Sequence, residues 1–171
     1  MTTIYTGLDI AKLNLQLHLL GRRHDLPNTA AGHRRLVKRL AALPGAHVIC
    51  EATGGYERDL VAALHDARIP VSVLNPARVR HFARATGQRA KTDPLDAAIL
   101  TAYGQALQPP PTAPRTPQEH HLSELIRRRV QVLALLVAQR QQAQRLTVPA
   151  LRRQAQSLVR RLERDLEQIE T

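Results

Sequence analysis

The sequence predicts an α/β fold in which flanking helices cover a mixed β-sheet, followed by an α-helical hairpin or coiled-coil segment. Residues 3–11 and 13–21 are neighbouring runs of near-alternating polarity, which indicates two adjacent strands. Beyond them, compact β-rich runs alternate with helical patterns, as in β-α-β units. Hairpin strands followed by such units predict a mixed sheet. This pattern suits a ribonuclease-H-like fold, although other α/β folds share parts of it.

The middle elements of this sheet domain follow from local patterns. After a short third strand near 26–30, residues 32–43 place apolar side chains at helical spacing and end at a Pro-Gly pair. The β-rich run at 46–52 predicts a buried strand. Residues 56–69 return to helical spacing, and 70–75 form a second buried run. The order is therefore strand, strand, strand, helix, strand, helix, strand.

Two more helices and a proline-rich segment complete this part of the chain. Pro76 opens a short helix at 76–86 in its first turn, and 93–107 is a longer helix. Five prolines in the ten residues 108–117 cannot continue a helix and predict a linker. The expected domains are a sheet domain at 1–108, a linker at 109–117 and a helical coiled-coil segment at 118–171.

The last segment carries the pattern of two long helices separated by Pro149. Their apolar side chains form a stripe made of Leu122, Leu125, Ile126, Val132, Leu133, Leu136 and Val137, then Leu151, Leu158, Leu162, Leu166 and Ile169. Such helices form an antiparallel pair or part of a coiled coil. Because one helix cannot bury this stripe by itself, we expect packing on the sheet domain, on another chain or on further sequence. A homo-oligomer formed through this segment is the expected assembly.

Charge and composition restrict the class of protein. The formal net charge of +11 favours a polyanionic partner, and nucleic acid is the first candidate, although a basic protein without such a partner shares this composition. The single cysteine, Cys50, excludes an intrachain disulfide and a cysteine-cluster zinc site. No apolar run reaches the ~18 residues of a membrane span, and the start of the chain lacks a signal-peptide pattern. We therefore expect a cytoplasmic protein with no membrane partner.

Four acidic residues are placed where they can converge. Asp9 and Glu51 lie at the ends of predicted strands, and Asp93 and Asp96 open a predicted helix. Carboxyl ends of neighbouring strands define the functional edge of an open α/β sheet. Carboxylates crowded at one edge repel each other, and a divalent cation relieves this repulsion. Mg²⁺ prefers such oxygen ligands and supports phosphodiester chemistry.

Each acid also has a simpler interpretation. Asp93 is well placed as a helix N-cap before Pro94, with Asp96 at the third helical position, where a carboxylate favours the helix dipole. Asp9 is equally compatible with a strand end, and Glu51 with a solvated position before a glycine-rich turn. Local physics alone favours capping for the aspartate pair. The two roles are compatible, because residues three apart lie about 60° apart around a helix.

Basic residues cluster next to the aspartate pair. The run comprises Arg78, Arg80, Arg84, Arg89 and Lys91. A solvated helix face is the ordinary explanation for a single run of this kind. Because this one leads directly into the acidic pair, we expect it to contact phosphates of a nucleic acid.

The ordered motifs "GLDIAK", "CEATGGYE" and "VLNPARVRHFARATGQRAKTDPLDAAILTAYG" resemble the DEDD transposases and recombinases, which include Piv-type invertases and the insertion-sequence "one-ten" transposases. The resemblance covers residues 4–108. It implies an N-terminal RuvC-like domain whose acids bind Mg²⁺, with Mn²⁺ as a possible substitute. By motif, these catalytic and metal-binding acids are Asp9, Glu51, Asp93 and Asp96. Lys12 and Lys91 also match family positions and are expected to contact nucleic acid.

The resemblance further implies DNA strand cleavage and exchange, with DNA and a structured bridge RNA as partners. In the family, a helical segment precedes a second domain that carries a nucleophilic serine. None of Ser72, Ser123 or Ser157 sits in that serine motif, so we expect the present 171 residues to lack this domain and not to recombine DNA alone. A stand-alone RuvC-type nuclease for branched DNA and a non-enzymatic nucleic-acid-binding and dimerisation fragment are the alternatives.

Overall fold

The computed structural model describes residues 2–87 and 97–171 in full and, of Asp96, the backbone only. The chain forms two compact units, residues 1–114 and 115–171, which we describe separately. Within the described residues, no helix is both long enough and apolar enough to cross a membrane.

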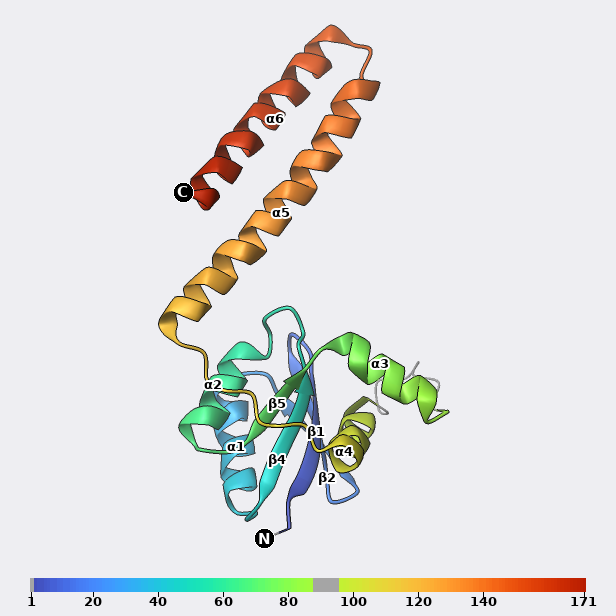
Figure 1. Ribbon diagram of the computed structural model, residues 1–171, viewed down its shortest axis with the longest axis vertical. Helices are drawn as coiled ribbons and strands as arrows, with labels where there is room; N and C mark the ends of the chain where they lie inside the picture. The colour runs from blue at the N-terminus through green and yellow to red at the C-terminus, as the bar shows by residue number, and fades with distance from the viewer. Residues whose placement is uncertain (1, 88–95) are drawn as a thin grey trace. The chain divides into compact units, whose positions relative to one another are not determined.

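Unit 1 contains a five-stranded mixed sheet in the order β3-β2-β1-β4-β5 (Figure 1). The strands are β1 (Ile4–Ile10), β2 (Asn14–Leu19), β3 (Arg22–Pro27), β4 (Ala46–Glu51) and β5 (Val71–Leu74). The first three pair antiparallel as a meander, whereas β4 lies parallel to β1 and β5 parallel to β4. This topology is that of the ribonuclease-H-like fold and confirms the predicted fold class. The third strand, predicted near 26–30, lies at Arg22–Pro27 instead, because Asn28 forms a bend and Thr29 caps the helix that begins at Ala30.

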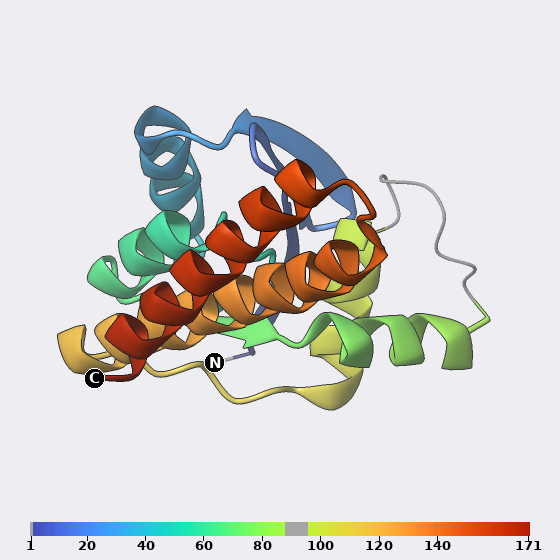
Figure 2. The same ribbon diagram turned by 90° about the horizontal axis from the view of Figure 1, so that it is seen from above.

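Helices cover both faces of the sheet. The helices α1 (Ala30–Ala41) and α2 (Arg58–Asp66) lie on one face, and α3 (Pro76–Ala85) and α4 (Asp96–Leu107) on the other (Figures 1 and 2). Strand β4 serves both layers, because successive side chains of a strand point to opposite faces. Val48 and Cys50 join the core under α1 and α2, and Ile49 joins the core under α3 and α4.

Two glycines allow α4 to approach the sheet closely. A β-carbon added at Gly7 of β1 would lie 1.8 Å from the carbonyl oxygen of Ala97, and one added at Gly104 of α4 would lie 2.7 Å from a side-chain carbon of Ile49. Both distances are too short for a real side chain. Because Tyr5 also lies under Gly104 while Gly7 lies under Ala97, α4 runs antiparallel to β1 and begins near the carboxyl end of that strand.

The proline-rich segment lies along β5 and belongs in part to unit 1. The backbone N–H of Thr112 donates to the carbonyl oxygen of Val71 at 2.8 Å. The Thr112 hydroxyl accepts from the backbone N–H of Val73 at 2.9 Å, and the Ser72 hydroxyl donates to the carbonyl oxygen of Pro110 at 2.8 Å. The segment thus occupies hydrogen-bonding groups of an edge strand, which would otherwise be available for pairing with another chain.

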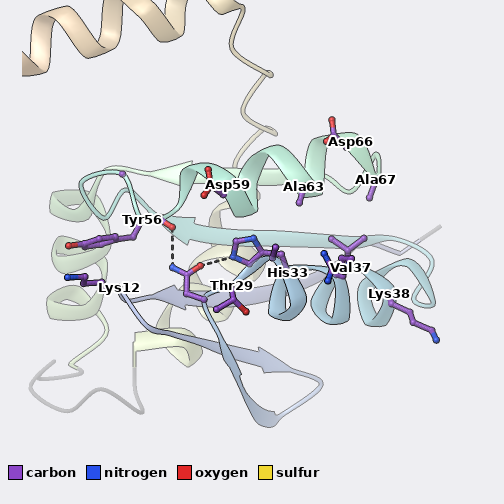
Figure 3. Close-up of a pocket in the computed structure, with 14 residues that line it drawn as sticks. Lys12, Thr29, His33, Val37, Lys38, Tyr56, Asp59, Ala63, Asp66 and Ala67 are labelled. Carbon is purple, nitrogen blue, oxygen red and sulfur yellow. Dashed lines mark hydrogen bonds between the residues drawn. The ribbon is translucent and has the colours of Figure 1, made fainter.

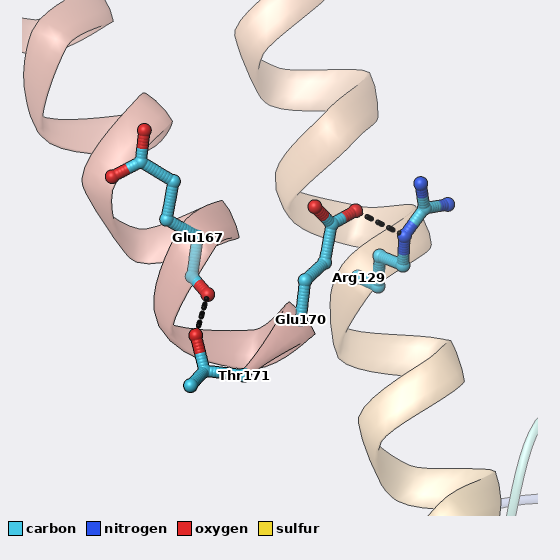
Figure 4. Close-up of polar contacts among 4 residues, drawn as sticks. All are labelled: Arg129, Glu167, Glu170 and Thr171. Atoms are coloured by element: carbon cyan, nitrogen blue, oxygen red, sulfur yellow. Dashed lines mark hydrogen bonds and ion pairs between the residues drawn. The ribbon is translucent and has the colours of Figure 1, made fainter.

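Unit 2 is an antiparallel pair of helices, α5 (Pro117–Arg145) and α6 (Pro149–Glu170), as predicted. The helix α5 starts with a capping box between Thr116 and Glu119. Val132, Leu136 and Leu162 form the buried core of the pair. Arg129 donates to Glu170 at 2.6 Å and joins the two helices at the end of α6 (Figure 4).

Candidate functional site

Asp9 and Glu51 lie side by side at one edge of the sheet. In the parallel pairing of β1 and β4, Leu8 lies opposite Cys50, so the next residue on each strand is one of the two acids. Neighbouring strands lie roughly 4.8 Å apart, which places the two α-carbons about 5 Å from each other. Both residues are half-buried. The structure therefore brings together the first two acids that the sequence predicts for the site.

Both acids point to the face that α3 and α4 cover. Tyr5 on β1 and Ile49 on β4 belong to the core under these helices, and side chains alternate along a strand. Asp9 and Glu51 are an even number of residues from Tyr5 and Ile49, respectively, so they share that face. Two carboxylates on one face of adjacent strands form a natural oxygen-donor pair for a hard divalent cation.

The start of α4 arrives at the same edge and face. Its first residue is Asp96, directly before Ala97, whose carbonyl oxygen lies over Gly7. Gly7 precedes Asp9 by two positions, so both lie on one side of β1. The N-terminus of a helix carries a partial positive charge that favours nearby carboxylates. The backbone thus places the start of α4 beside the two strand acids.

The remaining predicted residues are distributed as follows. Asp93, Arg89 and Lys91 lie outside the described residues, as does the side chain of Asp96. The described residues form no group of three or more histidine, cysteine, aspartate or glutamate side chains able to hold a metal. The basic residues Arg78, Arg80 and Arg84 are exposed on α3, which begins directly after the carboxyl end of β5. Lys12 is exposed in the loop after β1.

Glu57 organises the loop that follows Glu51. Its Oε2 atom accepts hydrogen bonds from the Thr53 backbone N–H at 3.1 Å, the Thr53 hydroxyl at 2.9 Å and the Gly55 N–H at 2.9 Å. Burial acts to raise the pKa of Glu57, but these bonds and its own backbone N–H together hold the pKa below its ordinary value. Gly54 and Gly55 have φ angles of +75° and +124°, which favour glycine. The glycines of this motif therefore serve a carboxylate-centred turn.

Asn28 connects this loop to the loop after β1. Its side-chain amide donates to the carbonyl oxygen of Ala11 at 2.9 Å and to that of Tyr56 at 3.3 Å. Its Oδ1 atom then acts as acceptor for Nε2 of His33 at 2.7 Å, which assigns the proton of a neutral His33 to Nε2. Burial lowers the pKa of His33, against the opposing effect of Asp59, and so favours this neutral form.

Cys50 takes no part in the site chemistry. Its side chain is fully buried in the core under α1 and α2, opposite the face of Asp9 and Glu51. Burial raises the pKa of its thiol to about 12, and the carboxylates of Glu57 and Glu51 add to this effect. A protonated thiol is neither a nucleophile nor a metal ligand.

Sequence reasoning missed Glu57 and Asn28. Glu57 stands in the quoted motif "CEATGGYE", and its position four residues after Thr53 was a usable signal for a side chain that closes a turn. Asn28 carried no local signal, because its partners Ala11 and Tyr56 are 17 and 28 residues away in the sequence.

Comparisons with known proteins agree with these features. A family model described as a transposase, for DEDD transposases of the insertion-sequence "one-ten" type, matches residues 6–148. The chain is 29% identical over 156 residues to the pilin gene-inverting proteins of Moraxella lacunata and Moraxella bovis. The alignment covers 86% of this chain and 48% of each relative, so the chain spans about half the length of these curated relatives.

Among solved structures, T. thermophilus RuvC in complex with a Holliday junction substrate is similar to this chain. The TM-score is 0.45 and the sequence identity is 15%. The match covers 64% of this chain and all of the RuvC chain.

Proposed function

The chain belongs to the DEDD transposase family, and from this premise we propose that it is the N-terminal catalytic portion of a DNA transposase or site-specific recombinase. In this proposal Asp9, Glu51, Asp93 and Asp96 hold Mg²⁺, or Mn²⁺ in its place. The observation that carries the proposal is the pairing of Asp9 and Glu51 on one face of adjacent parallel strands, beside the start of α4.

The donor set fits the expected ion. Carboxylate oxygens are the ligands that Mg²⁺ prefers, and it usually keeps waters or phosphate oxygens in its remaining positions. A bound Mg²⁺ would stabilise the charge that develops on phosphate oxygens during strand cleavage. The chain itself supplies a rigid frame for the carboxylates. Strands β1 and β4 set the spacing of Asp9 and Glu51, and the hydrogen bond from Gly7 to Thr101 fixes α4 against β1.

Phosphate binding is assigned to basic side chains around this edge. Arg78, Arg80 and Arg84 project from a helix that starts at the same edge, and Lys12 follows β1. We include Arg89 and Lys91 on the basis of their sequence positions. These cations would hold the backbone of a nucleic acid without reading its sequence. The similar proteins are named for inverting a gene, and we extend DNA as a substrate to this chain.

The finer points of the proposal concern partners. A structured bridge RNA is proposed from the family resemblance. A homo-oligomer formed through unit 2 is supported by apolar side chains of α5 that are at least one-third exposed, namely Leu122, Ile126, Val130, Leu133, Leu135 and Val137. Because a recombinase must reach DNA, we place the protein in the cytoplasm. In this proposal these residues would contribute the metal site to DNA cleavage and exchange by the transposase.

Calorimetric titration with Mn²⁺ and Mg²⁺ tests the metal assignment. Substituting a residue that only hydrogen-bonds a metal ligand typically weakens metal binding by roughly 10–100-fold. We expect Asp9→Asn, Glu51→Gln and Asp96→Asn, which each remove a ligand, to weaken binding by more than this. Asp25→Asn is the matched control, since Asp25 is an exposed carboxylate on the edge strand β3, where it pairs with Arg23. Wild-type metal affinity in all three site variants would refute the assignment.

A second candidate function is a nucleic-acid-binding and dimerisation fragment without its own metal chemistry. The exposed apolar side chains of α5 and the basic character of the chain favour it. Nucleic-acid affinity that is unchanged by a chelator and by Asp9→Asn, in a protein that light scattering shows to be dimeric, would support this candidate over the first.

A further inference from the structure

Tyr56 is set apart from the other aromatic residues of this chain. The sequence contains three tyrosines, one phenylalanine and no tryptophan. Tyr5, Phe82 and Tyr103 all pack in the core under α3 and α4. Tyr56, in contrast, is 50% exposed. A half-exposed aromatic ring outside the core clusters, in a chain with so few aromatic residues, is a candidate for contact with a partner.

The backbone that carries Tyr56 is held in place from two sides. The carboxylate of Glu57 closes the preceding turn through Thr53 and Gly55. The side chain of Asn28 donates to the carbonyl oxygen of Tyr56. The ring is therefore presented on an ordered loop, and little conformational freedom would be lost when it binds a flat ligand.

Asn28 also holds Lys12 next to this ring. The same amide group that bonds Tyr56 bonds the carbonyl oxygen of Ala11, the residue before Lys12. Figure 3 shows Lys12 and Tyr56 next to each other at one end of a cleft between α1 and α2. Both side chains line this cleft, which has a volume of about 910 Å³. A cation and an exposed aromatic face are thus adjacent on two loops joined by one asparagine.

The pair lies at the edge that carries the acids. Lys12 follows the end of β1, three residues after Asp9, and Tyr56 follows the end of β4, five residues after Glu51. The carboxyl ends of these parallel strands share one edge of the sheet. The cleft continues between α1 and α2, where Arg34 and Lys38 line it together with Asp59 and Asp66. The cation and the ring are therefore next to each other at the end of the cleft that adjoins the loops after β1 and β4, where an unpaired strand leaving the acidic edge could reach both.

We propose that Tyr56 and Lys12 form a subsite for one unpaired nucleotide, with the base stacked on the Tyr56 ring and its phosphate contacting Lys12. This inference rests on the proposed function and specifies where an unpaired strand leaves the acidic edge. Stacking on an aromatic ring tolerates every base, because each base has a flat π-face, and the lysine contributes charge without sequence preference. The subsite accepts an unpaired strand of either DNA or RNA, since both supply a base and a phosphate.

The test measures binding of two fluorescent single strands of identical sequence, one DNA and one RNA, to the whole chain by anisotropy. We expect Tyr56→Leu to weaken binding of the preferred strand by about 10-fold, within the range for loss of one base stack. Tyr56→Phe keeps the ring and should bind like the wild type. Leu13→Ala is the matched control, because Leu13 is 71% exposed beside Lys12 but has no aromatic face. Lys12→Gln should reduce the slope of log binding constant against log salt concentration by about 1, the value for one phosphate contact.

A second measurement locates the base directly. A strand with 5-iodouracil at one position is irradiated with the protein, and the digested products are sequenced by mass spectrometry. A crosslink at Tyr56, lost in Tyr56→Leu and retained in Tyr56→Phe, supports the subsite, and the strand that crosslinks identifies DNA or RNA as the source. If Tyr56→Leu binds both strands with wild-type affinity and the wild type gives no crosslink at Tyr56, the subsite is overturned while the proposed function still stands. Failure of the wild type to bind either strand would overturn the proposed function as well.

Discussion

The backbone N–H of Gly7 donates a hydrogen bond of 2.7 Å to the hydroxyl oxygen of Thr101, and this bond fixes α4 to β1 two residues from Asp9. The same hydroxyl oxygen lies 2.9 Å from Nδ1 of His18 on β2 and 3.1 Å from the carbonyl oxygen of Ala97. One buried threonine thus connects two strands with the helix that begins at Asp96. The geometry of the proposed metal site depends on this connection.

Gly7→Ala is expected to push α4 away from the sheet. The new methyl group would lie 1.8 Å from the Ala97 carbonyl oxygen and 2.7 Å from the Thr101 backbone nitrogen, and backbone atoms cannot rotate aside. We expect a loss of about 3 kcal/mol or more in the free energy of unfolding, measured by urea denaturation, together with weaker Mn²⁺ binding.

Gly21→Ala provides the comparison for this variant. A β-carbon at Gly21 meets no atom within 4 Å, although its φ of +76° is unfavourable for alanine. We expect a loss of about 1–2 kcal/mol and unchanged Mn²⁺ affinity. Equal effects of the two substitutions on stability and metal binding would contradict the role assigned to Gly7.

Thr101→Val tests the hydrogen bond itself. Valine has nearly the same shape but leaves the buried Gly7 N–H without its acceptor, which costs about 1–3 kcal/mol of unfolding free energy. Thr101→Ser keeps the hydroxyl and should retain more of the stability than valine does. Hydrogen exchange of the Gly7 amide is the direct measurement. Faster exchange in Thr101→Val than in Thr101→Ser is expected, and the reverse order would contradict the assignment.

The main elements of the fold could be predicted because each carries a local signal. Polarity alternates along β1 and β2, and helical spacing marks α1 and α2, so the hairpin and the β-α-β order followed directly. The strand β3 was misplaced because it is a polar edge strand whose sequence, RRHDLP, has no alternating apolar face. Edge strands bury little, so their sequences are weakly restricted.

The candidate site was predictable only in part. Asp9 and Glu51 could be placed together because both end parallel strands, and strand ends meet at one edge. Asn28 and the role of Gly7 could not be found, since each acts through a partner far away in the chain, in the loops after β1 and β4 or on α4. Such contacts depend on how the helices dock. Asp93 stays a prediction from motif, because it lies outside the described residues.

Glu57→Gln is expected to loosen the loop that carries Tyr56. Glutamine keeps an acceptor oxygen but loses the charge that strengthens the bonds from Thr53 and Gly55. Faster amide exchange at Thr53 and Gly55, at unchanged exchange in α5 and α6, is the expected result. Equal amide exchange rates at Thr53 and Gly55 in the wild type and in Glu57→Gln would show that the carboxylate does not order this loop.

Glu57→Gln should also change how the free energy of unfolding depends on pH. The pKa of Glu57 is lowered in the folded protein, so its stabilising contribution is present above the unfolded pKa near 4.5 and is lost as pH falls through the folded pKa. Urea denaturation at pH 6 and pH 3.5 should show a smaller acid-induced loss in Glu57→Gln than in the wild type. Glu124→Gln on α5 is a control in unit 2, and a matching change there would contradict a specific role of Glu57.

His47 makes the packing of the proline-rich segment sensitive to mild acid. Its Nε2 lies 2.8 Å from the Ser72 hydroxyl, which in turn donates to the Pro110 carbonyl oxygen, so a neutral His47 is the donor to Ser72. Its ring also packs on Tyr5, with centroids 5.2 Å apart. Burial lowers the pKa of His47 from its ordinary value of 6.5. Protonation would add a charge in a buried position and weaken this arrangement.

The sign of the pH effect follows from this lowered pKa. Because the pKa of His47 is lower in the folded protein, the unfolded chain binds a proton at His47 more readily. The contribution of neutral His47 to the free energy of unfolding is therefore fully present above about pH 6.5 and decreases as pH falls toward the folded pKa. His47→Gln keeps an N–H donor at the position of Nε2 but does not titrate. Urea denaturation at pH 7.5 and pH 5.5 should therefore show a smaller loss of stability in His47→Gln than in the wild type. Exposed His121→Gln on α5 should behave like the wild type, and an equal pH response of His47→Gln and wild type would refute this role of His47.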